Sequence, residues 1–196
     1  MSAPTIGPPP ATTSPGEPAL EVAVRPVEPS EAGHVVDTVF AGLSPRSRLM
    51  RFHAPVPRLP ANVRAALVAV DGRRHAAVVA LTPDTDGRPT PVGVARVIGP
   101  GHGRADLALA VVDAWQRCGL GRRLLAAVSA VAEEIGYTEL RGSVLPDNAA
   151  MLALARRLHP GVRPRWDGAA VELLVPVGAA AVTITDEDVM ADLLSR

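Results

Sequence analysis

The chain has 196 residues, a formal net charge of zero, a single cysteine and 47% hydrophobic residues. This length and hydrophobic share suit one domain with a sizeable core, flanked by tails. Zero net charge gives no electrostatic reason to expect nucleic acid or an anionic membrane as a partner. One cysteine excludes an internal disulfide and a multi-cysteine metal site, and we expect no metal.

The N-terminus shows no basic region followed by an apolar core, and no stretch is long and apolar enough to span a bilayer. We therefore expect a cytoplasmic protein. All 20 basic residues are arginine. Together with abundant alanine, valine and proline, this usage indicates a GC-rich genome, and we expect a bacterial source.

The first elements follow a proline-rich segment. Residues 1–18 have little to bury, which predicts a disordered tail. Apolar residues then alternate from Leu20 to Val24, which predicts a strand closed by Pro26. Ser30 is a candidate N-cap for the next helix, and Ser44 followed by a proline marks a second helix start.

The middle of the chain predicts a short helix near residues 61–68 and then two strands. These strands are expected at 75–81 and 92–98, separated by a turn rich in Asp, Gly, Thr and Pro. The glycine-rich loop at 99–103 leads into a further strand. We expect the strands on either side of this loop to form a hairpin.

The chain is organised around residues 105–125. Residues 108–112 are an apolar run of strand length, stopped by Asp113. Gly119 and Gly121 lead into a helix with one apolar stripe, and Gly136 ends that helix as a C′ glycine. The sequence therefore predicts a strand, a glycine turn and an amphipathic helix in direct succession.

This arrangement is typical of a phosphate site. The first N–H groups of a helix have no intrahelical partner, and the helix dipole adds partial positive charge there. Glycines let an anion approach the backbone, while Arg117, Arg122 and Arg123 add full charges. A P-loop is excluded because the chain has no lysine, and a GxGxxG fingerprint is excluded because Leu124 replaces its third glycine.

Residues 116–121, Gln-Arg-Cys-Gly-Leu-Gly, match the pattern Q/R-x-x-G-x-G/A. This resembles the acetyl-coenzyme A motif of the GNAT superfamily of N-acetyltransferases. A strand at 138–145 and an asparagine-led helix from Asp147 follow in the order that the superfamily uses. The resemblance implies an α/β (α+β) fold over residues 19–177, with a mixed central sheet of about six to seven strands, flanked by helices and splayed between strands four and five.

Within that domain, residues 163–165 and 169–175 predict a terminal hairpin around Trp166-Asp167-Gly168. Residues 178–196 are expected to be a C-terminal tail. Its short helix would be capped by Thr185 with Asp188.

The resemblance also implies acetyl-CoA as cosubstrate, bound by the strand end, the turn, the helix start and the asparagine that heads the next helix. These positions are Ala110, Val111, Val112, Gln116, Arg117, Cys118, Gly119, Leu120, Gly121, Arg122, Arg123 and Asn148. Strand amides would pair with the pantetheine arm and polarise the thioester carbonyl. Asn148 equally suits a plain N-cap, and the two roles are compatible. Cys118 is expected to face the pyrophosphate, so a covalent mechanism is not expected of it.

Residues 43–52, LSPRSRLMRF, are similar to the LSPxSxxxRF segment of the GNAT domain of bacterial protein lysine acetyltransferases. This similarity implies a protein lysine side chain as the first acceptor, with the segment walling the acceptor site. A small amine or amino-acid derivative is the second candidate. A capped amphipathic helix with solvated arginines is the plainer interpretation of the same residues.

An amine must lose a proton before or during attack, because an ammonium has no lone pair. Where the lysine acetyltransferases commonly have a glutamate, residues 105–108 have Ala-Asp-Leu-Ala, so the resemblance assigns the general base to Asp106 or to a water it orients. The shorter side chain withdraws the carboxylate by about 1 Å, enough to weaken direct proton abstraction. The helix after Asn148 also lacks the tyrosine that serves many relatives as general acid.

These two departures motivate a different class of function, a CoA-binding sensor or interaction module with weak turnover. A solvated aspartate at a strand start is the corresponding interpretation of Asp106. The sequence leaves open whether the chain forms a homodimer.

Overall fold

The computed structural model describes residues 22–158, 162 and 164–178. Its elements in chain order are β1 (Ala23–Pro26), α1 (Ala32–Ala41), α2 (Pro45–Phe52), α3 (Ala61–Val68), β2 (His75–Pro83), β3 (Pro89–Ile98), β4 (Gly103–Val111), a 3-10 turn (Asp113–Trp115), α4 (Leu120–Ile135), β5 (Tyr137–Val144), α5 (Ala149–Leu158), β6 (Arg165–Asp167) and β7 (Ala170–Pro176).

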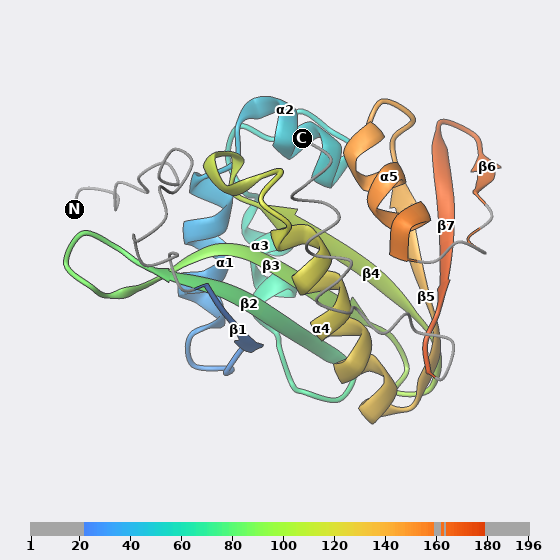
Figure 1. The fold of residues 1–196 in the computed structure, drawn as a ribbon, viewed down its shortest axis with the longest axis horizontal. Helices are drawn as coiled ribbons and strands as arrows, with labels where there is room; N and C mark the ends of the chain where they lie inside the picture. Colours follow the sequence, from blue (N-terminus) through green and yellow to red (C-terminus); the bar gives the residue numbers. More distant parts are fainter. Residues whose placement is uncertain (1–21, 159–161, 163, 179–196) are drawn as a thin grey trace, which may run out of the picture.

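The described strands form one seven-stranded sheet in the order β1-β2-β3-β4-β5-β7-β6. All neighbours pair antiparallel except β4 and β5, which are parallel. Figure 1 shows α4 lying across one face of the sheet and α1 on the other. The predicted mixed sheet flanked by helices is confirmed, including the hairpin of β3 and β4.

The core lies between α4 and the central strands. Leu124, Leu125 and Val128 of α4 are completely or almost completely buried, because the apolar stripe of this helix faces the sheet. Burial of each leucine contributes about 2 kcal/mol. Strand β2 is buried along almost its whole length, and α4 packs against it on one face of the sheet. On the other face α1 packs against the neighbouring strand β3, with α3 against α1.

Two predicted helix ends are confirmed and one is wrong. Ser44 caps α2, accepting the Ser47 N–H at 3.2 Å, and Gly136 ends α4 with φ 105°. Ser30 does not cap α1; Glu31 occupies the N-cap position. The Glu31 carboxylate instead accepts the Glu28 N–H and pairs with Arg25, so the turn before α1 is held by these contacts.

Strand bounds also differ from the predicted ones. The fourth strand begins at Gly103 rather than at residue 108, so Asp106 lies within β4 and not at its start. In the terminal hairpin, β6 continues through Trp166 to Asp167, and the turn falls at 168–169. The predicted tail at 1–18 and the Thr185 helix lie outside the described residues, as does Arg163.

Candidate active site

Strands β4 and β5 pair only along their first halves. The paired positions run from Gly103 with Tyr137 to Asp106 with Arg141, although β4 continues to Val111. Figure 1 shows the two strands diverging beyond that point. The splay predicted between the fourth and fifth strands is therefore present. It leaves residues 107–111, the unpaired edge of β4, without a neighbouring strand among the described residues on that side.

The alternation of backbone groups decides which residues this edge presents. In an antiparallel pair, successive residues direct their N–H and C=O groups to opposite sides. The Val112 N–H donates to the Val92 oxygen, so Ala110 and Val112 face β3. Leu109 and Val111 consequently direct their backbone groups toward the unpaired edge. Of the strand positions named from the sequence, only Val111 does so, and Leu109 was missed although the period of two could have identified it.

The turn between β4 and α4 holds two residues with positive φ, Arg117 at 64° and Gly119 at 77°. The first helical hydrogen bonds run from the N–H groups of Arg122 and Arg123 to the Gly119 oxygen. The amides of Leu120 and Gly121 therefore precede the helical ladder. They form the N-terminus of a 16-residue helix, where an anion is stabilised by N–H groups and by the dipole.

Gln116 fixes this turn from within. Its Nε2 donates to the Val111 oxygen at 3.0 Å and to Ser47 Oγ at 3.1 Å. On the same side, Asp113 Oδ1 accepts the Ser44 N–H at 3.0 Å. The start of α2, with the LSPxS residues, is thus tied to the turn by side-chain hydrogen bonds, and Gln116 occupies one carbonyl of the unpaired edge.

The three arginines of the motif have different surroundings. Arg123 donates from Nη2 to the Val22 oxygen at 2.6 Å, next to β1. Arg122 is partly buried, and Arg117 is exposed in the turn. The Cys118 thiol is also exposed and donates to the Gln116 oxygen at 3.3 Å. Arg123 therefore joins α4 to the residue that precedes β1, while Arg122 and Arg117 lie at the start of α4.

Helix α5 adjoins the start of α4. A Cβ at Gly121 would lie 3.3 Å from a methyl group of Leu154, so glycine permits this close approach. Asn148 Oδ1 accepts the Met151 N–H at 3.1 Å, which is the geometry of an N-cap. The plain capping role of Asn148 is present in the structure, at the end of β5 that lies away from β4.

Asp106 carries an ion pair at the point where the strands separate. Arg141 Nε donates to Asp106 Oδ1 at 2.9 Å, and Arg141 Nη2 lies 2.9 Å from the same oxygen. Arg141 Nη1 also lies 3.6 Å from Glu172 of β7. The hydrogen bond that Arg141 donates to the Asp106 carboxylate raises the pKa of Arg141 above its usual value. Sequence reasoning missed Arg141 and Glu172, because strand register alone brings Arg141 to Asp106 and Glu172 to Arg141.

Tyr137 does not reach the separated ends of the strands. Its ring is buried at the paired start of β5, and its hydroxyl accepts the Gly101 N–H at 3.0 Å. Within the described ranges, no group of three or more His, Cys, Asp or Glu residues could hold a metal ion. No described helix is long and apolar enough to cross a membrane.

The chain was compared with protein families and with solved structures. The sequence model described as "Acetyltransferase (GNAT) family" matches residues 48–159. The GNAT domain of S. lividans PAT is 24% identical, with a TM-score of 0.68 over 79% of this chain and 89% of that one. Salmonella typhimurium yncA, solved with acetyl-CoA, is 15% identical, with a TM-score of 0.55 over 84% of this chain and 98% of that one.

A cAMP-binding acyltransferase from Mycobacterium smegmatis is 24% identical, with a TM-score of 0.53 over 86% of this chain. The match covers 48% of that protein, so this chain spans about half of its length. The family model alone covers more than half of the present chain. The chain therefore belongs to the GNAT family and is an N-acetyltransferase.

Proposed function

We propose that the protein moves an acetyl group from acetyl-CoA to a primary amine, and that a protein lysine side chain is the first acceptor to test. The observation that carries the proposal is the separation of β4 from β5 beyond Asp106, beside the N-terminus of α4. The unpaired edge offers hydrogen-bonding groups at Leu109 and Val111, and the helix start offers N–H groups to an anion. A long donor with an amide arm and a pyrophosphate fits this combination.

The residues that would bind acetyl-CoA lie in the turn before α4 and along the unpaired edge of β4. Val111, Gly119, Leu120 and Gly121 would act through their backbones, and Arg122 through its charge. Arg117 and Cys118 border the same turn. Asn148 heads α5, where its side-chain nitrogen is available beyond the cap that Oδ1 makes. Ala110 and Val112 would act indirectly, because their backbone groups face β3 and so direct those of Val111 to the unpaired edge.

Asp106 would accept the proton that the amine loses, directly or through a water. Both contacts from Arg141 end on Oδ1. Among the described residues no partner is found for Oδ2, and 63% of the side chain is exposed. Arg141 thus fixes the orientation of the carboxylate and leaves one oxygen for the amine. The nitrogen then bonds to the acetyl carbon as the carbon–sulfur bond breaks and the thiolate leaves, which needs no dedicated acid.

The similarity of residues 43–52 to protein lysine acetyltransferases supports the lysine acceptor. The alternatives are a small amine acceptor and a CoA-binding module with weak turnover, the latter favoured by the ion pair that engages Asp106. Mass spectrometry of a lysine peptide and of small amines, incubated with acetyl-CoA and the protein, separates the three. Because the chain has no lysine, acetylation of its own lysine side chains cannot contribute to the signal.

A further inference from the structure

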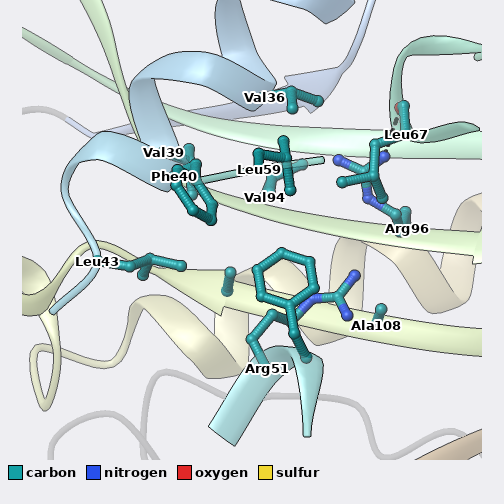
Figure 2. Close-up of a pocket in the computed structure, with 12 residues that line it drawn as sticks. Val36, Val39, Phe40, Leu43, Arg51, Leu59, Leu67, Val94, Arg96 and Ala108 are labelled. Carbon is teal, nitrogen blue, oxygen red and sulfur yellow. Dashed lines mark hydrogen bonds between the residues drawn. The ribbon is translucent and has the colours of Figure 1, made fainter. Parts of the chain in front are cut away.

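A small cavity lies on the face of the sheet opposite α4, between the sheet and α1, α2 and α3 (Figure 2). Its volume of about 30 Å³ is room for roughly two water molecules or one small polar group. Ala108 and Ala110 of β4 form part of its floor. Among the described residues that line it, Arg51 of α2 and Arg96 of β3 carry charge, and all the others are apolar.

Arg96 is buried, with 4% of its surface exposed. Its Nη1 donates to the Leu67 oxygen at 2.6 Å and lies 3.3 Å from Nε2 of His75. The Leu67 carbonyl carries no charge. Burial and the charge of Arg96 lower the pKa of His75, which favours the neutral form of its ring. Burial, followed by repulsion from Arg51, lowers the pKa of Arg96 to about 10.

Arg51 is the arginine of the LSPxSxxxRF segment, and Figure 2 shows its guanidinium pointing into the cavity. Its Cζ lies 5.0 Å from the ring centroid of Phe52. In the part of the chain that the structure describes, no hydrogen bond or ion pair from Arg51 is found. Burial lowers its pKa as well.

Two guanidinium groups that share an apolar cavity without an acidic partner are unfavourable, because each has lost water and each repels the other. An anion between them would offset both costs. A planar carboxylate matches the fork of N–H donors on a guanidinium, and its size suits the cavity.

The position of the cavity indicates where such a carboxylate comes from. Ala108 follows Asp106 by two residues on β4, so their side chains lie on the same face, about 7 Å apart along the strand. Arg96 is opposite Ala108 in the register. A molecule with its carboxylate in the cavity can therefore place a nearby amine beside Asp106.

We infer that the cavity between Arg51 and Arg96 binds a carboxylate of the amine acceptor. This inference rests on the proposed acetyl transfer and narrows it: the acceptor carries a carboxylate close to the reacting nitrogen. A free amino acid and an acidic side chain beside a lysine share this chemistry, and acetyl transfer to matched acceptors distinguishes them.

The first test measures binding without turnover. Thermal unfolding of the full chain is followed with acetate or with its neutral analogue acetamide, at constant ionic strength. Acetate raises the melting temperature and acetamide does not, because a ligand that binds only the folded state stabilises it. Arg51→Gln abolishes the rise, whereas Arg46→Gln, an exposed arginine on the same helix, keeps it. A rise with neither compound, or an equal rise in Arg51→Gln, overturns the inference.

The second test measures acetyl transfer to matched acceptors. Alanine is compared with alaninamide, and a lysine peptide with glutamate next to the lysine is compared with its glutamine counterpart. In the pair that serves as substrate, the carboxylate form has a kcat/KM about tenfold higher or more, and Arg51→Gln removes the difference. The pair that responds identifies the source of the carboxylate. No preference in either pair, or a preference that survives in Arg51→Gln, overturns the inference.

Arg96→Lys provides a second variant that retains a cation in the buried position, and it should retain stabilisation by acetate more fully than Arg96→Gln. Equal stabilisation of both variants contradicts a role for the charge at this position.

Failure of the proposed function would look different, since acetate would still stabilise the protein while acetyl-CoA failed to bind. Failure of the inference alone would leave acetyl transfer intact and indifferent to the carboxylate.

Discussion

Asp106 and Arg141 face each other at the last paired position of β4 and β5, and both contacts from Arg141 end on the same carboxylate oxygen, at 2.9 Å. The pair therefore lies where the parallel strands separate. It holds the proposed base at the start of the unpaired edge while leaving its second oxygen toward solvent.

Replacing Asp106 by asparagine should remove the proton acceptor and preserve the donor site. We expect kcat to fall by about 10²-fold or more, while the affinity for acetyl-CoA stays nearly unchanged. Steady-state kinetics and calorimetry on the same preparation measure the two quantities. Asp86→Asn, in the exposed turn before β3, serves as the control. Wild-type turnover in Asp106→Asn would show that the amine loses its proton without the help of this carboxylate.

Gln116→Ala should loosen the turn, since this side chain joins the Val111 oxygen to Ser47 of α2. Loss of these hydrogen bonds should cost about 1 kcal/mol of unfolding free energy and weaken acetyl-CoA binding. Ser47→Ala removes one of the two contacts and should have a smaller effect on both. Urea unfolding and calorimetry provide the measurements. Unchanged affinity for acetyl-CoA in Gln116→Ala would mean that the hydrogen bonds of Gln116 are irrelevant to the acetyl-CoA site.

Arg122 and Arg123 form a matched pair for testing the charge at the helix start. Arg122→Glu should weaken acetyl-CoA binding by about tenfold or more, because a charge-assisted contact is lost and repulsion replaces it. Arg123→Gln should mainly lower stability, because Arg123 is hydrogen-bonded to the Val22 oxygen. If Arg123→Gln reduces donor affinity as much as Arg122→Glu does, the division of roles between the two arginines is wrong.

The turn before β2 should contribute a pH-dependent part of the stability. Asp71 Oδ1 accepts the N–H groups of Arg73, Arg74 and His75, and these hydrogen bonds lower its pKa from 3.8 to about 2. The unfolded chain therefore takes up the proton first as the pH falls. The contribution is complete above about pH 4 and is lost as the pH falls toward 2.

Asp71→Ala should accordingly be less stable than wild type at pH 7 and 5, with the difference shrinking toward pH 2. Urea unfolding at each pH measures it. Asp86→Ala is the control, because its exposed pair with Arg88 is 3.8 Å long and should matter little at any of these pH values. A stability difference for Asp71→Ala that is constant from pH 7 to pH 2 would refute this assignment.

Local patterns in the sequence were sufficient to predict the strand, turn and helix around Gly119, the end of α4 at Gly136 and the cap at Ser44. Each depends on residues within a few positions of one another. The cap at Ser30 failed because Arg25 and the Glu28 N–H engage Glu31, a competition that spacing alone does not resolve.

The contacts that define the candidate site join residues that are distant in the chain. Asp106 and Arg141 are 35 positions apart, and Arg123 and Val22 are 101 apart. The cavity likewise joins Arg51 to Arg96 through the packing of α2 on the sheet. Such pairs depend on strand register and helix placement, which residue periodicity does not specify.

The central claim is that the unpaired edge of β4 and the start of α4 bind acetyl-CoA, and isothermal calorimetry with the purified full chain tests it most directly. We expect micromolar binding with one site per chain, competed away by excess free CoA and weakened in Arg122→Glu. Absence of binding by both acetyl-CoA and CoA would show that the turn at residues 116–123 is purely structural, and the proposed acetyl transfer would then be wrong.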